Sequence, residues 1–298
     1  IGFFALIFIA FIPLFILEEK AESSKQVFGY SFLAFFIFNL IATYWVYHAS
    51  TFGALCAFII NASLMAVAFW LFHQIRIMSS DRIGYMSFIF SWISMEYFHL
   101  NWDLSWPWLT LGNVFAEFPV IVQWYEFSGF LGGSFWVLLI NILLFRVYKS
   151  NCKKKLMLLT ALFFFLPIGF SYYIWLNITD QDDKSIEVLI VQPNINPYYD
   201  KFTKGYKDQL LDFIELAESK ITRNTQLLIG PETVLLEGLW ENKFENTYSV
   251  VTLRDVQKNF PNLNILLGAT TYKMFKNKEQ KTNTAREIKD ENIFYDAY

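Results

Sequence analysis

The chain has 298 residues, of which 55% are hydrophobic and 20% are aromatic, and its formal net charge is −3. This small charge offers no basic footprint for nucleic acid, so we exclude nucleic acid as a partner. Cys56 and Cys152 lack the spacing of a zinc or redox motif, and we expect neither a metal nor a cofactor. The single histidines His48 and His73 lie at predicted span ends, where we expect them to be neither catalytic nor ligands.

Residues 1–175 predict a bundle of membrane-spanning helices. No Asp, Glu, Lys or Arg occurs from Ile1 to Leu17 or between Lys25 and Arg76, and an uncharged apolar stretch of about 18 residues or more is a candidate membrane span. We expect about six spans, at roughly 1–17, 27–48, 52–74, 83–99, 119–145 and 156–175. The chain begins with Ile instead of Met and stops at Tyr298, so we interpret it as an internal piece of a longer protein.

The basic residues of this half predict its orientation. All nine lie in alternate loops, at Lys20, Lys25, Arg76, Arg82, Arg146, Lys149 and Lys153 to Lys155. The intervening loops, 49–51 and 100–118, hold none. Because basic loops remain in the cytoplasm, the chain should leave its last span on the opposite side. Residues 176–298 are therefore expected to be extracytoplasmic.

The loop between the fourth and fifth predicted spans is unusually aromatic. It contains Trp102, Trp106 and Trp108, and tryptophan is enriched in the headgroup layer of membranes. Two interpretations remain open, an interfacial anchor and the wall of a groove that admits lipid. Glu96 and Glu126 lie near the outer ends of predicted spans, where an acid is either structurally paired or functional.

Residues 176–298 predict a soluble α/β domain. Apolar runs predict strands at 186–193, 227–229 and 265–269, and helical periodicity is present at 202–221 and 244–259. This alternation is typical of a layered fold with parallel strands. The second strand runs directly into Gly230-Pro231-Glu232, which brings Glu232 to the sheet edge where α/β folds bind ligands. The polar residues 276–291 predict an exposed hairpin or loop, and 294–295 a further strand.

These features resemble a known family. The Gly230-Pro231-Glu232 turn and its flanking strands resemble the start of a nitrilase-type (carbon–nitrogen hydrolase) domain. Behind a bundle of membrane spans, such a domain resembles the apolipoprotein N-acyltransferases. Further stretches similar to that family are Tyr44-Trp45-Val46-Tyr47 with Thr51-Phe52-Gly53, Trp106-Pro107-Trp108-Leu109 with Leu111-Gly112-Asn113, and Tyr295-Asp296-Ala297-Tyr298. The resemblance implies a nitrilase-like αββα fold, of which residues 176–298 would be the N-terminal part.

The resemblance also implies an activity. Such enzymes transfer an acyl chain from a phospholipid to the N-terminal amine of the diacylglyceryl-cysteine of apolipoproteins, through a cysteine thioester, as the final step of lipoprotein maturation. They act in the bacterial cytoplasmic (inner) membrane, with the catalytic domain on the periplasmic side. Of their catalytic Glu, Lys and Cys, only the Glu matches, at Glu232. The Lys and Cys would lie beyond Tyr298, so this stretch alone is expected to be inactive. Trp45, Trp106 and Trp108 are expected to contact lipid.

Other interpretations remain open at this stage. An acid that follows a strand often caps the next helix, so Glu232 has a structural alternative. The protein could be another membrane-anchored nitrilase-fold amidase or acyltransferase, or a transport or scaffold protein without enzymatic activity. Transporters tend to carry broken spans with polar residues near the midplane, and the uncharged residues 26–75 argue against that class.

Overall fold

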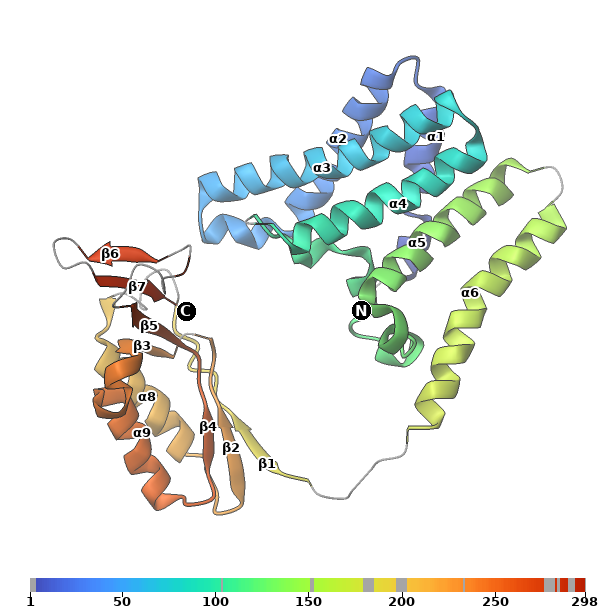
Figure 1. Ribbon diagram of the computed structural model, residues 1–298. Coiled ribbons are helices and arrows are strands. Elements are labelled where there is room, and N and C mark those ends of the chain that lie inside the picture. The colour runs from blue at the N-terminus through green and yellow to red at the C-terminus, as the bar shows by residue number, and fades with distance from the viewer. Residues whose placement is uncertain are drawn as a thin grey trace. The chain divides into compact units, whose positions relative to one another are not determined.

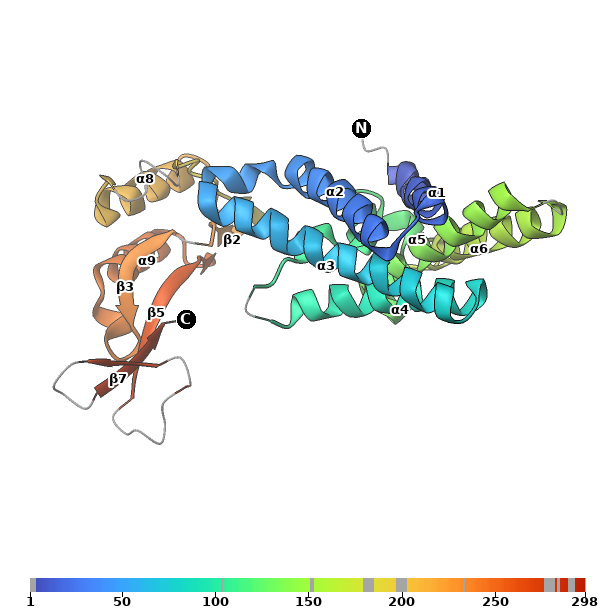
Figure 2. The same cartoon turned by 90° about the horizontal axis from the view of Figure 1, so that it is seen from above.

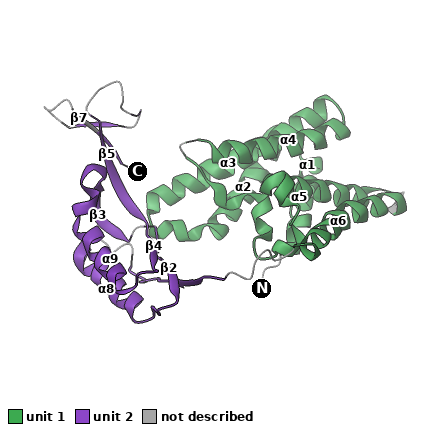
Figure 3. Cartoon of the chain, turned by 60° about the horizontal axis from the view of Figure 1, so that its bottom comes forward, with its two compact units in different colours: residues 1–180 green, residues 181–298 purple. Residues whose placement is uncertain are grey.

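The computed structural model of the chain describes residues 4–102, 104–150, 153–178, 185–196, 203–232, 234–275, 282, 285–288 and 293–297 (Figure 1). The chain divides into two compact units, residues 1–180 and residues 181–298 (Figure 3). Each unit is described by itself.

The first unit is helical. Its longer helices are α1 (Ile12–Lys20), α2 (Ser24–Ala42), α3 (Thr51–Met78), α4 (Asp81–Leu100), α5 (Tyr125–Lys149) and α6 (Lys153–Leu176). Short 3-10 turns are η1 (Phe4–Ile9), η2 (Tyr44–His48), η3 (Pro107–Leu109), η4 (Leu111–Phe115) and η5 (Pro119–Ile121). Serine side chains cap α2, α3 and α4 by accepting a backbone N–H in the first turn, at Ser23, Ser50 and Ser80. Helix α3 packs between α2 and α4 (Figure 2).

Four described helices are long and apolar enough to cross a membrane, namely Ser24–Ala42, Thr51–Met78, Tyr125–Lys149 and Lys154–Leu176. Two of the six predicted spans differ from this pattern. Residues 83–99 form most of α4, where Glu96 and His99 lower the mean hydropathy. The predicted first span is divided into η1 and α1, and Pro13 lies in the first turn of α1, where a missing N–H is tolerated.

A side chain of α5 satisfies the backbone at the break between η1 and α1. The Asn141 carboxamide oxygen accepts the N–H of Phe11 at 2.9 Å, and its amide nitrogen donates to the Ile7 carbonyl at 2.8 Å. Asn141 is fully buried, so water does not satisfy these groups. An irregular backbone in an apolar surrounding requires such a partner.

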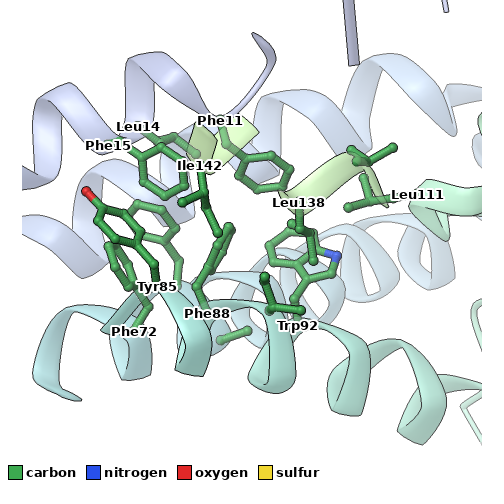
Figure 4. Packing of buried hydrophobic residues seen from close by; sticks show 14 of the residues in the cluster. Phe11, Leu14, Phe15, Phe72, Tyr85, Phe88, Trp92, Leu111, Leu138 and Ile142 are labelled. Carbon is green, nitrogen blue, oxygen red and sulfur yellow. The ribbon is translucent and has the colours of Figure 1, made fainter. Parts of the chain in front are cut away.

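Aromatic rings fill the core of the first unit (Figure 4). Phe15, Phe88 and Trp92 are fully buried. The Phe11 and Trp92 rings pack edge to face with centroids 4.9 Å apart, and Phe15 and Phe88 do so at 5.3 Å. These distances lie in the favourable range for aromatic pairs. Helix α5 carries the one described glycine with a left-handed backbone, Gly129 (φ 63°), where the helix bends.

A charged cluster joins three chain reversals at one end of the first unit. The buried carboxylate of Glu18 lies 2.5 Å from His73 Nδ1 and 2.8 Å from Arg76 Nη2. Arg76 also pairs with Asp81 at 3.0 Å. Neighbouring Glu19 pairs with Lys149 at the end of α5. The loops between α1 and α2, α3 and α4, and α5 and α6 therefore lie together. The sequence did not indicate that His73 has a structural partner, which is Glu18.

The described residues of the second unit form two sheets and two α-helices. Its elements are β1 (Glu187–Ile190), α8 (Tyr206–Glu218), β2 (Thr225–Ile229), β3 (Leu235–Trp240), η6 (Glu241–Asn246), α9 (Tyr248–Asn259), β4 (Asn264–Leu266), β5 (Ala269–Phe275), β6 (Arg286–Ile288) and β7 (Ile293–Ala297). One sheet has the strand order β1-β2-β4 and is parallel throughout. The other has the order β3-β5-β7-β6, in which β3 and β5 are parallel and the remaining pairs antiparallel. The chain passes from the first sheet to the second twice, between β2 and β3 and between β4 and β5.

The strand register separates the two faces of the parallel sheet. Leu189, Leu228 and Ile265 are paired across the three strands and pack into the core with α8 and α9. On the opposite face, Ile190, paired with Ile229, is 71% exposed, and Leu266 is 59% exposed. No element that the structure describes covers this second apolar face.

Several predicted elements are confirmed. The strands at 186–193 and 227–229 correspond to β1 and β2, the two predicted helices to α8 and α9, and the strand at 294–295 to β7. The predicted strand 265–269 is divided, because the chain leaves one sheet at Leu266 and enters the other at Ala269. Strand β3 was not predicted. Most of the polar segment 276–291 lies outside the described residues, although Arg286–Ile288 form β6.

The charged cluster gives a first testable prediction. In Glu18→Gln, Arg76 and His73 lose a buried anionic partner, so we expect the free energy of unfolding to fall by about 1.5–3 kcal/mol, the usual contribution of hydrogen bonds to charged groups. Thermal unfolding of the purified protein in detergent measures this loss. Glu22→Gln, an exposed acid four residues away, serves as the control and should unfold like the wild type. Equal melting temperatures for both variants would contradict the assigned role of Glu18.

Candidate functional site

The turn that carries Glu232 is held by backbone hydrogen bonds to the β4–β5 junction. The Gly230 N–H donates to the Leu266 carbonyl at 3.0 Å, and the Gly268 N–H donates to the Pro231 carbonyl at 3.1 Å. Beyond the turn, the Leu235 N–H donates to the Gly268 carbonyl at 3.2 Å. These hydrogen bonds join the β2–β3 connection to the β4–β5 connection. Glu232 lies at the C-terminal edge of the parallel strands, as predicted.

Gly268 permits this close approach. A Cβ atom built at position 268 would lie 1.7 Å from the Glu232 carbonyl oxygen and 2.4 Å from its Cα. Neither backbone atom can move without displacing the turn. Any side chain at position 268 would therefore displace the backbone of Glu232.

The Glu232 side chain is exposed and has no hydrogen bond or ion pair among the described residues. It does not cap a helix, because the element that follows is the strand β3. That capping role belongs to Glu237, whose carboxylate accepts the Ser249 N–H at 2.7 Å and the Tyr248 N–H at 3.2 Å, at the start of α9. Partial burial alone would raise the pKa of Glu237, but the hydrogen bonds from Ser249 and Tyr248 outweigh it and lower the pKa. The helix-capping alternative for Glu232 is therefore wrong.

In the part of the chain that the structure describes, no group of three or more His, Cys, Asp and Glu residues lies close enough to hold a metal ion. Cys152 lies outside the described residues, and Cys56 is a half-buried free thiol in α3. Of the predicted catalytic Glu, Lys and Cys, the described residues contain only the Glu, at position 232.

The structure brings the three predicted lipid-contacting tryptophans together in the first unit. Trp45, from η2, packs edge to face on Trp108 with ring centroids 5.5 Å apart, and Trp108 packs on Trp106 at 4.9 Å. Trp45 and Trp108 are 45% and 54% exposed. An aromatic cluster thus forms from two loops that are some sixty residues apart, since Trp45 and Trp106 differ by 61 positions.

The two acids predicted to lie near span ends have different surroundings. Glu126 is exposed in the first turn of α5. Glu96 is buried, and its Oε1 accepts the Trp92 indole N–H at 3.0 Å and the Leu111 N–H at 2.9 Å. Glu96 is therefore paired structurally through one of its two oxygens. His99, one turn later, is also buried, and nothing in the sequence pattern indicated it as part of a polar cluster.

The fold and these sites define a membrane-type helical unit followed by an α/β unit with an exposed acid at a strand end. Residues 1–143 match the family model of the apolipoprotein N-acyltransferase N-terminal domain. The chain is 25% identical over 236 residues to the apolipoprotein N-acyltransferase of Chlorobaculum tepidum, covering 77% of this chain and 44% of that protein. It is 25% identical over 266 residues to apolipoprotein N-acyltransferase 1 of Treponema denticola (83% and 47%), and 24% over 275 residues to the Borreliella burgdorferi protein (87% and 50%).

These matches confirm the resemblance found in the sequence. Most of the chain is similar in sequence to apolipoprotein N-acyltransferases, and the family model of their N-terminal domain matches its first 143 residues. It spans about half the length of the curated relatives it matches.

The contact between Gly268 and Glu232 gives a second prediction. Gly268→Ala should displace the turn and reduce stability by about 1–3 kcal/mol, the typical effect of overpacking. Hydrogen–deuterium exchange of residues 230–235 should accelerate, because the N–H groups of Gly230 and Leu235 bond to the displaced junction. In Gly205→Ala, the added Cβ would meet only the flexible Asp208 carboxylate at 3.2 Å, so exchange should stay near that of the wild type. Unchanged exchange in Gly268→Ala would show that the turn does not depend on this contact.

Proposed function

We propose that the protein transfers an acyl chain from a phospholipid to the N-terminal amine of the diacylglyceryl-cysteine of apolipoproteins, with Glu232 as its general base. The observation that carries this proposal is the exposed carboxylate of Glu232, which has no hydrogen bond or ion pair among the described residues. Its backbone turn is held by hydrogen bonds at the C-terminal edge of parallel strands. The similarity to apolipoprotein N-acyltransferases supports the general reaction. The whole protein's donor, acceptor and thioester step are part of the proposal.

The proposed chemistry requires a proton acceptor at this position. A cysteine becomes a good nucleophile when a base takes its proton. Glu232 would take that proton as the thiol attacks the phospholipid ester and return it to the leaving glycerol oxygen. In the second half-reaction Glu232 would deprotonate the incoming amine while the thiolate leaves. An exposed carboxylate held by its backbone suits these transfers, because its side chain is free to bond first one partner and then the other.

We also propose that residues 176–298 are the first part of a nitrilase-like domain. The parallel strands and the two helices on one face of the sheet support this assignment. The uncovered apolar face with Ile190 and Leu266 supports a further layer packed against the sheet. An amidase of the same fold is the second candidate, and the acceptor that the acyl chain reaches would separate the two.

The charged cluster supports the proposed orientation in the membrane. Lys149, Arg76 and the end of α1 are joined by ion pairs, so the basic loops share one end of the first unit. We assign that end to the cytoplasm by the positive-inside rule, in the bacterial inner membrane. The tryptophan cluster of Trp45, Trp106 and Trp108 would then lie at the outer headgroup layer and contact lipid.

Cysteine labelling tests the orientation. In a background of Cys56→Ser and Cys152→Ser, the variant Lys243→Cys should react with a membrane-impermeant maleimide once the outer membrane is permeabilised. Lys153→Cys should react only after the inner membrane is lysed, because the basic loops are cytoplasmic. The opposite pattern would refute the assigned topology.

The variant Glu232→Gln tests the catalytic role in the full-length protein. Glutamine keeps the size of the side chain but cannot carry the proton, and loss of a general base typically lowers the rate by about 10²–10⁴. We expect loss of the hydroxylamine-sensitive acyl-enzyme formed from labelled phospholipid, with an unchanged melting temperature.

Glu237→Ala is the matched control, since it removes an acid five residues away that caps α9. It should lower stability by about 0.5–2 kcal/mol and leave the acyl-enzyme in place. A normal acyl-enzyme in Glu232→Gln would remove the proposed role of this acid.

A further inference from the structure

The first unit contains a cavity of about 350 Å³ between α3 and the segment that follows α4. Most of its wall is apolar, with Cys56, Ala57, Ile60 and Leu104 among its lining residues. Its polar lining groups include Asn61, His99 and Trp106. Small-molecule sites have this character, an apolar wall with a few polar groups that fix the orientation of the ligand.

A second, much smaller cavity adjoins the first. It also touches Asn61, His99 and Trp106, and adds Glu96. Its volume of about 10 Å³ is on the order of that needed for a single water-sized group. The two cavities together form an apolar groove that ends in a polar recess.

Three buried polar atoms around this recess have no hydrogen-bond partner among the described residues: Glu96 Oε2, His99 Nε2 and Trp106 Nε1. Burying such atoms unpaired is costly, so native proteins satisfy nearly all of them. Ser134 lies beside Glu96, and its hydroxyl accepts the Gly112 N–H at 3.0 Å and can donate its own proton to the Glu96 carboxylate, although Oε2 itself has no hydrogen-bond partner among the described residues.

The hydrogen-bonding character of each atom follows from its neighbours. The Trp102 indole N–H lies 3.2 Å from His99 Nδ1, which must accept it, so the neutral imidazole carries its proton on Nε2. Trp106 Nε1–H can only donate. Glu96 Oε1 already accepts two N–H groups, and Oε2 of this carboxylate, which lines the recess, has no hydrogen-bond partner among the described residues and remains as an acceptor. The recess therefore offers two donors and one acceptor.

A hydroxyl group matches this set. Its oxygen can accept both N–H groups, and its proton can be donated to the carboxylate. An ammonium cannot accept from His99 or Trp106, and an ester carbonyl leaves the Glu96 oxygen unpaired. No described Lys or Arg lines either cavity, so a phosphate would lack a counter-charge there.

We propose that this groove binds a single-chain lipid with a free hydroxyl, its chain along α3 and its hydroxyl held by Glu96, His99 and Trp106. The site lies within the first unit and does not depend on the role of Glu232. A monoacylglycerol and a lysophospholipid both supply this chemistry.

Native mass spectrometry of the purified full-length protein in detergent can measure binding of 1-oleoylglycerol, its di-O-methyl ether and 1-oleoyl-lysophosphatidylethanolamine. We expect the wild type to bind at least one hydroxyl-bearing lipid about ten-fold or more tightly than the ether, because the ether leaves the buried carboxylate unpaired. The tighter of the two hydroxyl lipids identifies the source.

Trp106→Phe keeps the ring and removes one donor. It should weaken binding of the hydroxyl lipid and reduce its advantage over the ether. Trp175→Phe, an exposed indole on α6, is the matched control and should bind like the wild type. If the wild type binds the ether as tightly as both hydroxyl lipids, or binds none of the three, the proposal is overturned. Because this comparison of the three lipids uses only the wild type, it does not depend on whether a variant folds.

Discussion

Polar groups buried in the apolar half of this protein must find partners inside the protein, and this constraint organises the first unit. Asn39 and Asn61, on neighbouring helices, join their carboxamides at 2.5 Å, and Asn39 also donates to the Phe35 carbonyl. Glu18 gathers His73 and Arg76 at the opposite end. Because each unpaired group would be costly in a surrounding without water, these pairs fix which helices are neighbours more specifically than the aromatic core does. Around the recess beside Glu96, three buried polar atoms have no hydrogen-bond partner among the described residues, and it is there that a ligand is inferred.

The second unit positions its acid by a different device. Glu232 has no side-chain partner among the described residues, so its place is set by its backbone alone, through Gly230, Pro231 and Gly268. Glu237, five residues later, is fixed by its side chain instead. A carboxylate that must exchange protons with successive partners is better held by its backbone than by hydrogen bonds that lower its pKa.

The features that the sequence predicted well are those encoded locally. The apolar run before Gly230-Pro231-Glu232 is enough to place β2 and its terminal acid, and alternating basic loops are enough to place the shared charged end. Strand β3 was not predicted because Glu237 and Gly238 interrupt its apolar pattern. The strand is stabilised instead by pairing with β5, some thirty residues away. The divided first span escaped for the same reason, since its break is satisfied by Asn141. The Glu96 recess combines α3, α4 and a loop, and no local pattern marks it.

The link between Asn141 and the first helical segment has a consequence for biosynthesis. Phe11 and Asn141 are 130 residues apart, and at a synthesis rate of roughly 5–20 residues per second the second follows the first by on the order of 10 seconds. During that interval the broken backbone at Ile7 and Phe11 has no partner from α5. The first segment must therefore wait, in contact with water or with the insertion machinery, until α5 arrives. Helix α5 is thus expected to close back onto the segment at residues 4–20, which is translated before it.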